Sequence, residues 1–265
     1  MLPLYCDLSA KDGLKSEIAR TLGADVSDIA ACDLFLYNRM DASVWGANGE
    51  FFSCPRIDDL ECAYTSLVAF LQSEAVGHMN VFALFDNEEV GSSIKQGADS
   101  PFMRDVLTRA MAALGMSDAG IRAAFCASFM VSADNAHAVH PNHPEKYDVG
   151  NRTFMNCGVV IKHNANQKYT TDAVSSAIFS AVCEKAGVPV QHFANRSDVP
   201  GGSTLGNIAN THASMNTVDI GLAQLAMHSS YETAGVKDVQ YMVDGLSSFY
   251  ATDIQMLADG TFELK

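Results

Sequence analysis

Short apolar runs alternate with segments of helical periodicity along most of this 265-residue chain. A strand buried on both faces has an almost continuous apolar sequence. A helix packed on a sheet instead repeats apolar residues every three or four positions. Alternation of the two patterns predicts an α/β domain in which a mixed sheet lies between helices.

The individual elements follow from the same patterns. We expect strands at 33–38, 81–85, 127–132, 157–162 and 190–193. We expect helices at 12–22, 60–71 and 236–250, one that Asp172 opens and Gly187 closes, and one that begins at Ser100-Pro101.

Composition limits the class of protein. With 48% hydrophobic and 18% charged residues, the chain has the apolar material for one large domain or two small ones. It contains no apolar run of the roughly 18 residues that a membrane span needs, so no membrane partner is expected. The opening MLPLYCDLSAKDG lacks the pattern of a signal peptide, and the seven cysteines are odd in number with no CxxC pair. These features favour the cytoplasm and argue against disulfides or a thiolate zinc site.

The net charge of −14 argues against nucleic acid as a partner, because phosphate neutralisation needs a basic face and no Lys/Arg cluster is present. An acidic protein can still bind an acidic ligand where a local cation or a metal overrides the overall field.

Chemistry is expected just after the apolar runs, because α/β sheets bind ligands beyond the carboxyl ends of their strands. The segment 86–92 (DNEEVGS) places three carboxylates within four residues directly after VFALF. A bound cation is the simplest way to hold them together. A solvated acidic loop is the alternative.

A second polar segment, 132–141 (SADNAHAVHP), also follows an apolar run. Its Asp134 and the two histidines after it can supply a ligand and substrate contacts. The alternative is a capping aspartate with two half-exposed histidines. Asp58 and Asp59 begin a helical pattern, where an N-cap role, taken alone, is the better explanation.

Three further signals are weaker. Lys162 closes an apolar run and is either a surface residue or the cation that an acidic substrate requires. The loop 201–206 (GGSTLG) is rich in glycine but lacks the lysine of a phosphate-binding loop. His228 stands alone, as structural histidines usually do.

Taken together, these segments supply Asp, Glu-Glu, Asp and His at the ends of successive elements. Zinc accepts carboxylate oxygen and imidazole nitrogen, and paired metals bridged by a carboxylate are typical of hydrolases. The spare glutamate of the adjacent pair would act as a general base. A magnesium phosphohydrolase stays open as an alternative, since carboxylates also suit hard cations.

Six motifs now match, in order, the signature segments of one enzyme family. They are PRIDDL, FDNEEVGS, SADNAHAVHPN, GVVIKHNANQKY, GGSTLGNI and MHSSYE, spread over residues 55–232. The chain thereby resembles the C-terminal, larger part of the aspartyl aminopeptidases, which are dinuclear zinc enzymes.

The resemblance implies a role for each matching residue. Asp58 would bridge two zinc ions and Glu89 would bind one of them. Asp134 would bind one zinc ion and His228 the other. Glu88 would be the general base. Three residues would contact the substrate: His137, Lys162 and Tyr169.

The implied reaction is hydrolysis of N-terminal acidic residues from peptides by a homo-oligomeric enzyme. Residues 1–50 would be the end of a dimerisation insertion, and 51–265 the zinc aminopeptidase catalytic domain. Asn87, His143 and Val159 depart from the family pattern, at positions where it usually has histidine, tyrosine and proline.

One family motif is missing. The family carries an HxDSP-type segment whose histidine is a further ligand, and no HxD occurs in this sequence. We therefore expect an N-terminally truncated chain that shows little activity alone and regains it with the histidine segment. The alternative is a non-catalytic, metal-binding remnant of such an enzyme.

Overall fold

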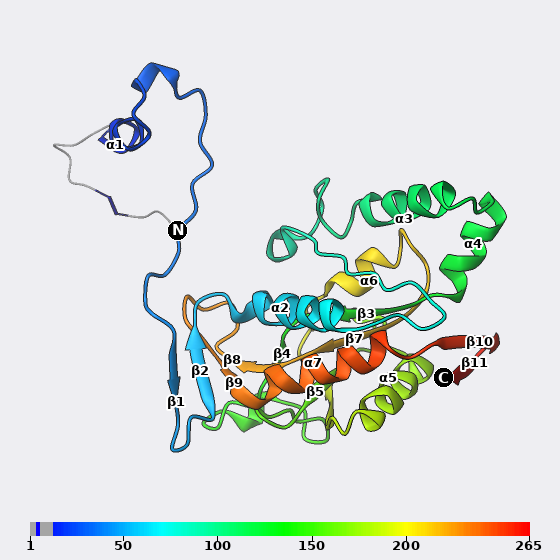
Figure 1. Cartoon of the computed structure of the whole chain (residues 1–265). Helices are drawn as coiled ribbons and strands as arrows, with labels where there is room; N and C mark the ends of the chain where they lie inside the picture. Colours follow the sequence, from blue (N-terminus) through cyan, green and yellow to red (C-terminus); the bar gives the residue numbers. More distant parts are fainter. Residues whose placement is uncertain (1–3, 6–12) are drawn as a thin grey trace. The chain divides into compact units, whose positions relative to one another are not determined.

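The computed structural model of the protein describes residues 4–5 and 13–265 (Figure 1). The chain forms two compact units, one ending at Tyr37 and the other spanning Asn38–Lys265. In the first unit, α1 (Gly13–Leu22) precedes a short 3-10 helix, Val26–Asp28. The predicted helix at 12–22 is confirmed over α1, and residue 12 lies outside the described residues. The roles assigned to 1–50 and 51–265 stay predictions.

The second unit is built on a four-stranded mixed sheet with the order β3-β7-β5-β6. Its strands are β3 (Phe129–Ala133), β5 (Val159–His163), β6 (Val190–Ala194) and β7 (Asn216–Gly221). β3 runs parallel to β7 and β5 runs parallel to β6, whereas β5 and β7 are antiparallel. The predicted mixed sheet is confirmed, and three predicted strands are found within two residues of their expected ends.

A second sheet, of very short strands, was not predicted. Its order is β1-β2-β9-β8-β4, and its strands are β1 (Ser43–Trp45), β2 (Phe51–Cys54), β4 (Ala136–His137), β8 (Ala223–Leu225) and β9 (Glu232–Gly235). β3 continues into β4 and β7 continues into β8, and the amide of Ala136 donates to the carbonyl of Leu222 at 2.8 Å. Asp134 therefore lies where one sheet passes into the other.

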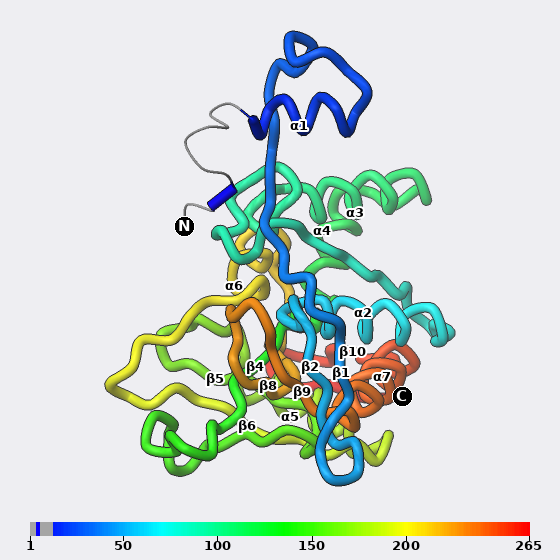
Figure 2. The backbone as a smooth tube through the Cα atoms, turned by 90° about the vertical axis from the view of Figure 1, so that its left-hand side faces the viewer, coloured from blue at the N-terminus to red at the C-terminus, as the bar shows by residue number. Residues whose placement is uncertain are grey.

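Helices cover both faces of the four-stranded sheet (Figures 1 and 2). On one face α2 (Ile57–Gln72), α5 (Ala173–Lys185) and α7 (Val236–Tyr250) enclose the main apolar core around β5 and β7. On the other face α3 (Phe102–Ala113), α4 (Asp118–Ala127) and α6 (Leu205–Ala209) form a smaller apolar cluster with Met130 of β3. The hairpin of β10 (Ile254–Ala258) and β11 (Thr261–Leu264) ends the chain.

The helix boundaries follow the predicted capping chemistry. The carboxylate of Asp172 accepts the amide of Ser175 at 2.7 Å at the start of α5. The Ser100 hydroxyl accepts the amide of Phe102 at 3.3 Å where α3 begins. The helices predicted at 60–71 and 236–250 are confirmed as α2 and α7. No helix among the described residues has the combined length and hydropathy that a bilayer-spanning segment needs.

Two predicted strands are wrong. Segments 33–38 and 81–85 are irregular, and Phe35 and Leu84 are exposed. A strand needs a partner for its backbone amides and carbonyls. Neither segment is paired with a strand in the part of the chain that the structure describes. Apolar composition predicted burial, but burial depends on a neighbour that the local sequence does not specify.

The central strand β7 was missed because a buried aspartate interrupts its apolar pattern. Asp219 is 1% exposed. Its carboxylate accepts the amide of Thr170 at 2.6 Å, the Thr170 hydroxyl at 2.7 Å and the Thr204 hydroxyl at 2.7 Å. Asp219 thus connects the segments that carry Thr170 and Thr204 to the central strand β7. A side chain at Gly206 would meet the Asp219 carboxylate at 2.6 Å, which explains the glycine in the loop 201–206.

Replacing Asp219 by alanine should lower the free energy of unfolding by about 3 kcal/mol, because three donors lose a charged acceptor in the interior. Urea denaturation followed by circular dichroism measures the change. The control is Asp244→Ala, since within the described part of the chain Asp244 makes only an exposed hydrogen bond, with Gln240. That variant should differ from the parent by less than about 0.5 kcal/mol. Equal stability of the two variants would contradict the role given to Asp219.

Candidate metal centre

Asp58 lies in an irregular first turn of α2. Arg56, just before the helix, has a left-handed backbone, and the Asp58–Asp59 peptide bond is cis. The amide of Asp58 donates to Glu232 Oε2 at 3.0 Å. The side chain of Asp58 is 5% exposed. The backbone therefore presents a nearly buried carboxylate at the end of the helix that faces the second sheet.

Glu88 and Glu89 begin a single 3-10 turn, η3 (Glu88–Val90). Left-handed residues stand on both sides of it: Asn87 with φ 60° and Gly91 with φ 99°. The Gly91 amide closes the turn on the Glu88 carbonyl at 2.8 Å. Glu88 is half-buried and Glu89 is exposed, so the two adjacent carboxylates have different surroundings.

His228 joins these two elements. It lies in the turn between β8 and β9, with a left-handed φ of 66°. Its Nε2 atom is 3.3 Å from Asp58 Oδ2 and 3.3 Å from Glu89 Oε2. The three ligand atoms lie within 4.8 Å of one another. Residues distant in the sequence thus form one group of atoms that could hold a metal ion.

A second group of ligand atoms shares Asp58. Carboxylate oxygens of Asp58, Asp59 and Asp134 also lie within 4.8 Å of one another. Asp134 comes at the carboxyl end of β3, and its Oδ2 accepts Lys162 Nζ at 3.3 Å. The Asp59 Oδ1 atom is buried without a hydrogen-bond partner. Two adjacent groups with one common carboxylate have the composition of a paired metal site.

Burial and neighbouring carboxylates raise the pKa values of three acidic residues at this centre. Burial, followed by the charges of Asp134 and Glu89, raises the pKa of Asp58 to about 8. Burial and Asp134 raise the pKa of Asp59 well above its usual value. Burial, Asp134 and Glu89 raise the pKa of Glu88 to about 7. Like charges gathered in a partly buried site favour a cation there.

The donor set fits zinc. Carboxylate oxygen and imidazole nitrogen are both ligands that zinc accepts. The unpartnered Asp59 oxygen and the raised pKa of Asp58 show negative charge that the described side chains do not fully compensate. The roles of Asp58, Glu89, Asp134 and His228 as ligands stay predictions.

Lys162 is the buried cation beside this centre. Its side chain is 3% exposed, and its Nζ atom lies 5.5 Å from the centre of the Tyr169 ring. Burial alone would lower the pKa of Lys162, but Asp134, Tyr169 and Asp219 raise it above its ordinary value. The ammonium is therefore charged and already paired with Asp134.

His137 lies on β4, beyond Asp134. The residue is exposed, yet protein atoms crowded around its ring lower its pKa, and the charges of Lys162 and His228 lower it further. Tyr169 is 6% exposed and packs in an apolar cluster with Phe193. The three residues predicted to contact substrate thus border the centre at different depths.

Sequence reasoning missed Glu232. This residue is 2% exposed, and its two carboxylate oxygens accept the amides of Asp58 at 3.0 Å and His228 at 2.8 Å. It therefore fixes the spacing of two predicted ligands. Glu232 closes the motif MHSSYE, four residues after His228, but nothing in the sequence marks it as buried or as the acceptor of these amides.

Sequence reasoning also missed the support behind Asp134. The Asn135 side chain donates to Glu61 Oε2 at 2.8 Å and to the carbonyl of Leu222 at 3.3 Å. Burial raises the pKa of Glu61 to about 8. This buried network connects α2 to the junction of the two sheets, and so holds Asp58 and Asp134 on one frame.

Comparison with known proteins places this geometry in a family. The model of the aminopeptidase I zinc metalloproteases (M18) matches residues 7–250. A probable M18 family aminopeptidase 2 of Clostridium novyi is 47% identical over 239 residues, which are 90% of this chain and 55% of the relative. A probable aspartyl aminopeptidase of Ricinus communis is 40% identical over 240 residues, 88% of this chain and 49% of the relative.

Solved structures agree. The matching chain in a cryo-EM structure of an Ape4–Nbr1 complex has a TM-score of 0.80 and 38% identity, over 89% of this chain and 46% of that one. An M18 aminopeptidase of Thermotoga maritima has a TM-score of 0.82 at 22% identity, over 94% and 57% of the two chains, and supports the fold alone. The chain spans about half the length of the curated relatives that it matches. It belongs to the aminopeptidase I family of zinc metalloproteases, M18.

Proposed function

We propose that the protein is a metalloaminopeptidase that removes N-terminal Asp or Glu from peptides with a two-zinc site. The observation that carries the proposal is the convergence of Asp58, Glu89 and His228 within 4.8 Å, beside a second group that shares Asp58. Membership of the M18 family and the likeness to a probable aspartyl aminopeptidase support it.

Four residues would hold the metal ions: Asp58, Glu89, Asp134 and His228. Zinc bound there would lower the pKa of a bound water molecule and polarise the scissile carbonyl group. Lys162 compensates part of the charge of Asp134, and Glu232 holds the backbones of Asp58 and His228.

Glu88 is the proposed general base. Its carboxylate is half-buried and belongs to the turn that carries Glu89. It makes no hydrogen bond with the described residues, so no such bond prevents it from accepting a proton. It would take a proton from the attacking water and deliver it to the leaving amine. The different exposure of Glu88 and Glu89 supports one acting as base and the other as ligand.

Lys162 is the proposed source of the acidic preference, with His137 and Tyr169 as further substrate contacts. A buried ammonium can attract a carboxylate strongly, because little water screens it. Its bond with Asp134 offers a second role, in which Lys162 only orients that carboxylate. The two roles differ in their effect on neutral substrates.

Two properties of the whole protein are also proposed. The matching chain in a structure titled as an mApe1 dodecamer has a TM-score of 0.77 and 28% identity, which supports a homo-oligomer. A cytoplasmic location is supported by cysteines that are free at all six described positions.

Activity is best tested in a chimera in which this chain replaces the matched region of the Clostridium novyi relative, because that relative is almost twice the matched length. The chimera should release N-terminal Asp from peptides in a zinc-dependent manner. A chimera that folds and binds zinc, yet cleaves no peptide, would favour a non-catalytic, metal-binding protein.

Zinc binding can be measured without activity. Isothermal titration of the 265-residue chain should show binding that Asp58→Asn weakens by about 100-fold or more, since Asp58 belongs to both ligand groups. Asp244→Asn, on the exposed face of α7, is the control and should bind as the parent does. Unchanged affinity in Asp58→Asn would remove the basis of the shared site.

Glu232→Gln should weaken zinc binding by about 10- to 100-fold, although Glu232 is not a proposed ligand. The amide group cannot accept both the Asp58 and the His228 amides, so the two side chains lose their fixed spacing. Glu263→Gln is the matched control, because among the described residues Glu263 pairs only with Lys265, near the surface. If both variants bind zinc like the parent, Glu232 does not position the ligands.

Glu88→Gln should lower kcat of the chimera by about 10²- to 10⁴-fold, because the amide cannot accept the proton of the attacking water. Zinc affinity should stay within about threefold of the parent, since Glu88 is not a proposed ligand. Titration and steady-state kinetics on the same preparation check both statements. A variant that keeps its kcat would show that another group acts as the base.

Lys162→Met in the chimera keeps most of the side-chain volume and removes the charge. If Lys162 binds the acidic side chain of the substrate, kcat/KM should fall at least tenfold more for an N-terminal Asp peptide than for the N-terminal Leu peptide that is otherwise identical. Equal losses on both peptides would assign Lys162 to orienting Asp134 instead.

A further inference from the structure

Two histidines form a pair on neighbouring strands at one edge of the four-stranded sheet. His163 ends β5, and His192 lies on the outer strand β6. The two strands are parallel, and their register places His192 beside Ile161, two residues before His163. Because side chains alternate between the faces of a strand, both imidazoles lie on the face that Ile161 shares with the main apolar core.

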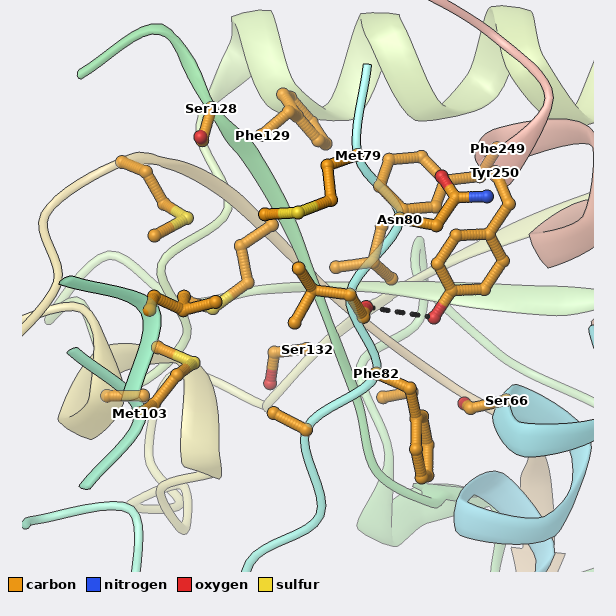
Figure 3. A pocket seen from close by; sticks show the side chains of 18 of the residues that line it. Ser66, Met79, Asn80, Phe82, Met103, Ser128, Phe129, Ser132, Phe249 and Tyr250 are labelled. Atoms are coloured by element: carbon orange, nitrogen blue, oxygen red, sulfur yellow. Dashed lines mark hydrogen bonds between the residues drawn. The ribbon is translucent and has the colours of Figure 1, made fainter. Parts of the chain in front are cut away.

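His163 also lines a surface cavity of about 510 Å³ at the start of α5, together with Asp172 and Ser176. This cavity is separate from the larger one that Figure 3 shows around Met79 and Phe129, which follows β3, the opposite outer strand. Neither histidine lines the larger cavity, and neither belongs to the two ligand groups of the metal centre. The pair is therefore a feature that the candidate metal centre does not explain.

The ring nitrogens of the pair face each other. Nε2 of His163 lies 3.0 Å from Nδ1 of His192, and the ring centroids are 5.2 Å apart with the ring planes inclined by 34°. One nitrogen therefore donates a hydrogen bond and the other accepts it. Burial lowers the pKa of His163, and the charge of His192 lowers it further. His163 is thus neutral near pH 7, and neutral imidazole is the form that binds metals.

The separation of the nitrogens suits two ligands of one metal ion. Zinc–nitrogen distances are about 2.0–2.1 Å, so two imidazole nitrogens on one ion lie about 3.0–3.4 Å apart. In the part of the chain that the structure describes, no carboxylate or thiol joins the pair as a third ligand, so water would occupy the other positions. Imidazole nitrogen suits Zn²⁺, Ni²⁺ and Cu²⁺, whereas Mg²⁺ and Ca²⁺ prefer oxygen.

A second histidine pair has the same ring separation without this geometry. The rings of His140 and His143 are also 5.2 Å apart. Nδ1 of His140 accepts the Asn142 amide at 3.2 Å, and Nδ1 of His143 lies 3.5 Å from Glu145. These nitrogens therefore have other partners, and the residues lie in the connection between β4 and β5 instead of on paired strands. His140 is accordingly a matched control for the pair on β5 and β6.

We propose that His163 and His192 form a second metal site, which binds one divalent transition-metal ion through Nε2 of the first residue and Nδ1 of the second. The residues are 29 positions apart, so both ligands meet only in the folded protein and the ion should stabilise the fold. It would join β5 to β6 just after Lys162, whose Nζ contacts Asp134 at 3.3 Å. The inference does not depend on the proposed reaction.

The test uses Ni²⁺, because Cu²⁺ can oxidise thiols and the structure describes six free cysteines. Isothermal titration should show a Ni²⁺ site in the 265-residue chain that persists in Asp58→Asn, where the proposed zinc centre is weakened. In that background His163→Gln and His192→Gln should each lower the Ni²⁺ affinity by about tenfold or more, because one imidazole cannot chelate the ion. Unchanged affinity in both variants, or no Ni²⁺ site in Asp58→Asn, would overturn the proposal.

Thermal denaturation gives a second readout. Ni²⁺ at 100 times its Kd should raise Tm by about 5 °C in Asp58→Asn. The rise should be absent when His163→Gln and His192→Gln are added together, and present when His140→Gln is added instead. Because glutamine can keep a hydrogen bond and His192 is exposed, the metal-free variants should fold, which circular dichroism checks. A rise that persists in the double histidine variant, or is lost with His140→Gln, would place the ion elsewhere and overturn the proposal.

Discussion

The mutual repulsion of carboxylates is the constraint on which the site depends. Burial raises the pKa values of Asp58 and Asp59, and the nearby charge of Asp134 raises both further. A fold holds such groups together only if backbone and buried partners fix them. Glu232 does so for Asp58 and His228 through two amides. The fold therefore holds uncompensated negative charge at the centre, and a bound cation would compensate it.

The two-sheet construction explains how these groups meet. β3 and β7 leave the main sheet and continue as β4 and β8, so Asp134 stands at the change of direction. Lys162, on β5, which pairs with β7, reaches Asp134 from within the core at 3.3 Å. Asn135 and Glu61 connect the same point to α2. The acidic residues are thus attached to several elements at once, and this rigid support is what a preorganised site requires.

The sequence was informative where local pattern decides structure. α7 and the capped start of α5 were predicted because periodicity and capping act over a few residues. β7 was missed because Asp219 makes a central strand look polar, and its partners Thr170 and Thr204 are distant in sequence. The role of Glu232 could not be predicted for a related reason. Its carboxylate accepts backbone amides, and the sequence does not indicate which amides a carboxylate will accept. The predicted strand 81–85 was wrong because pairing is a property of the whole sheet.

The irregular segment 79–85 also bears on the proposed general base, Glu88. Segment 79–85 leads directly into the turn with Glu88 and Glu89, and the segment and both glutamates line one mostly apolar cavity. Asp58, Asp134 and His228 are held by α2, by β3 and by Glu232, whereas the two glutamates depend on a segment with few backbone bonds. Local stability follows such contacts, so the turn is the least supported part of the centre.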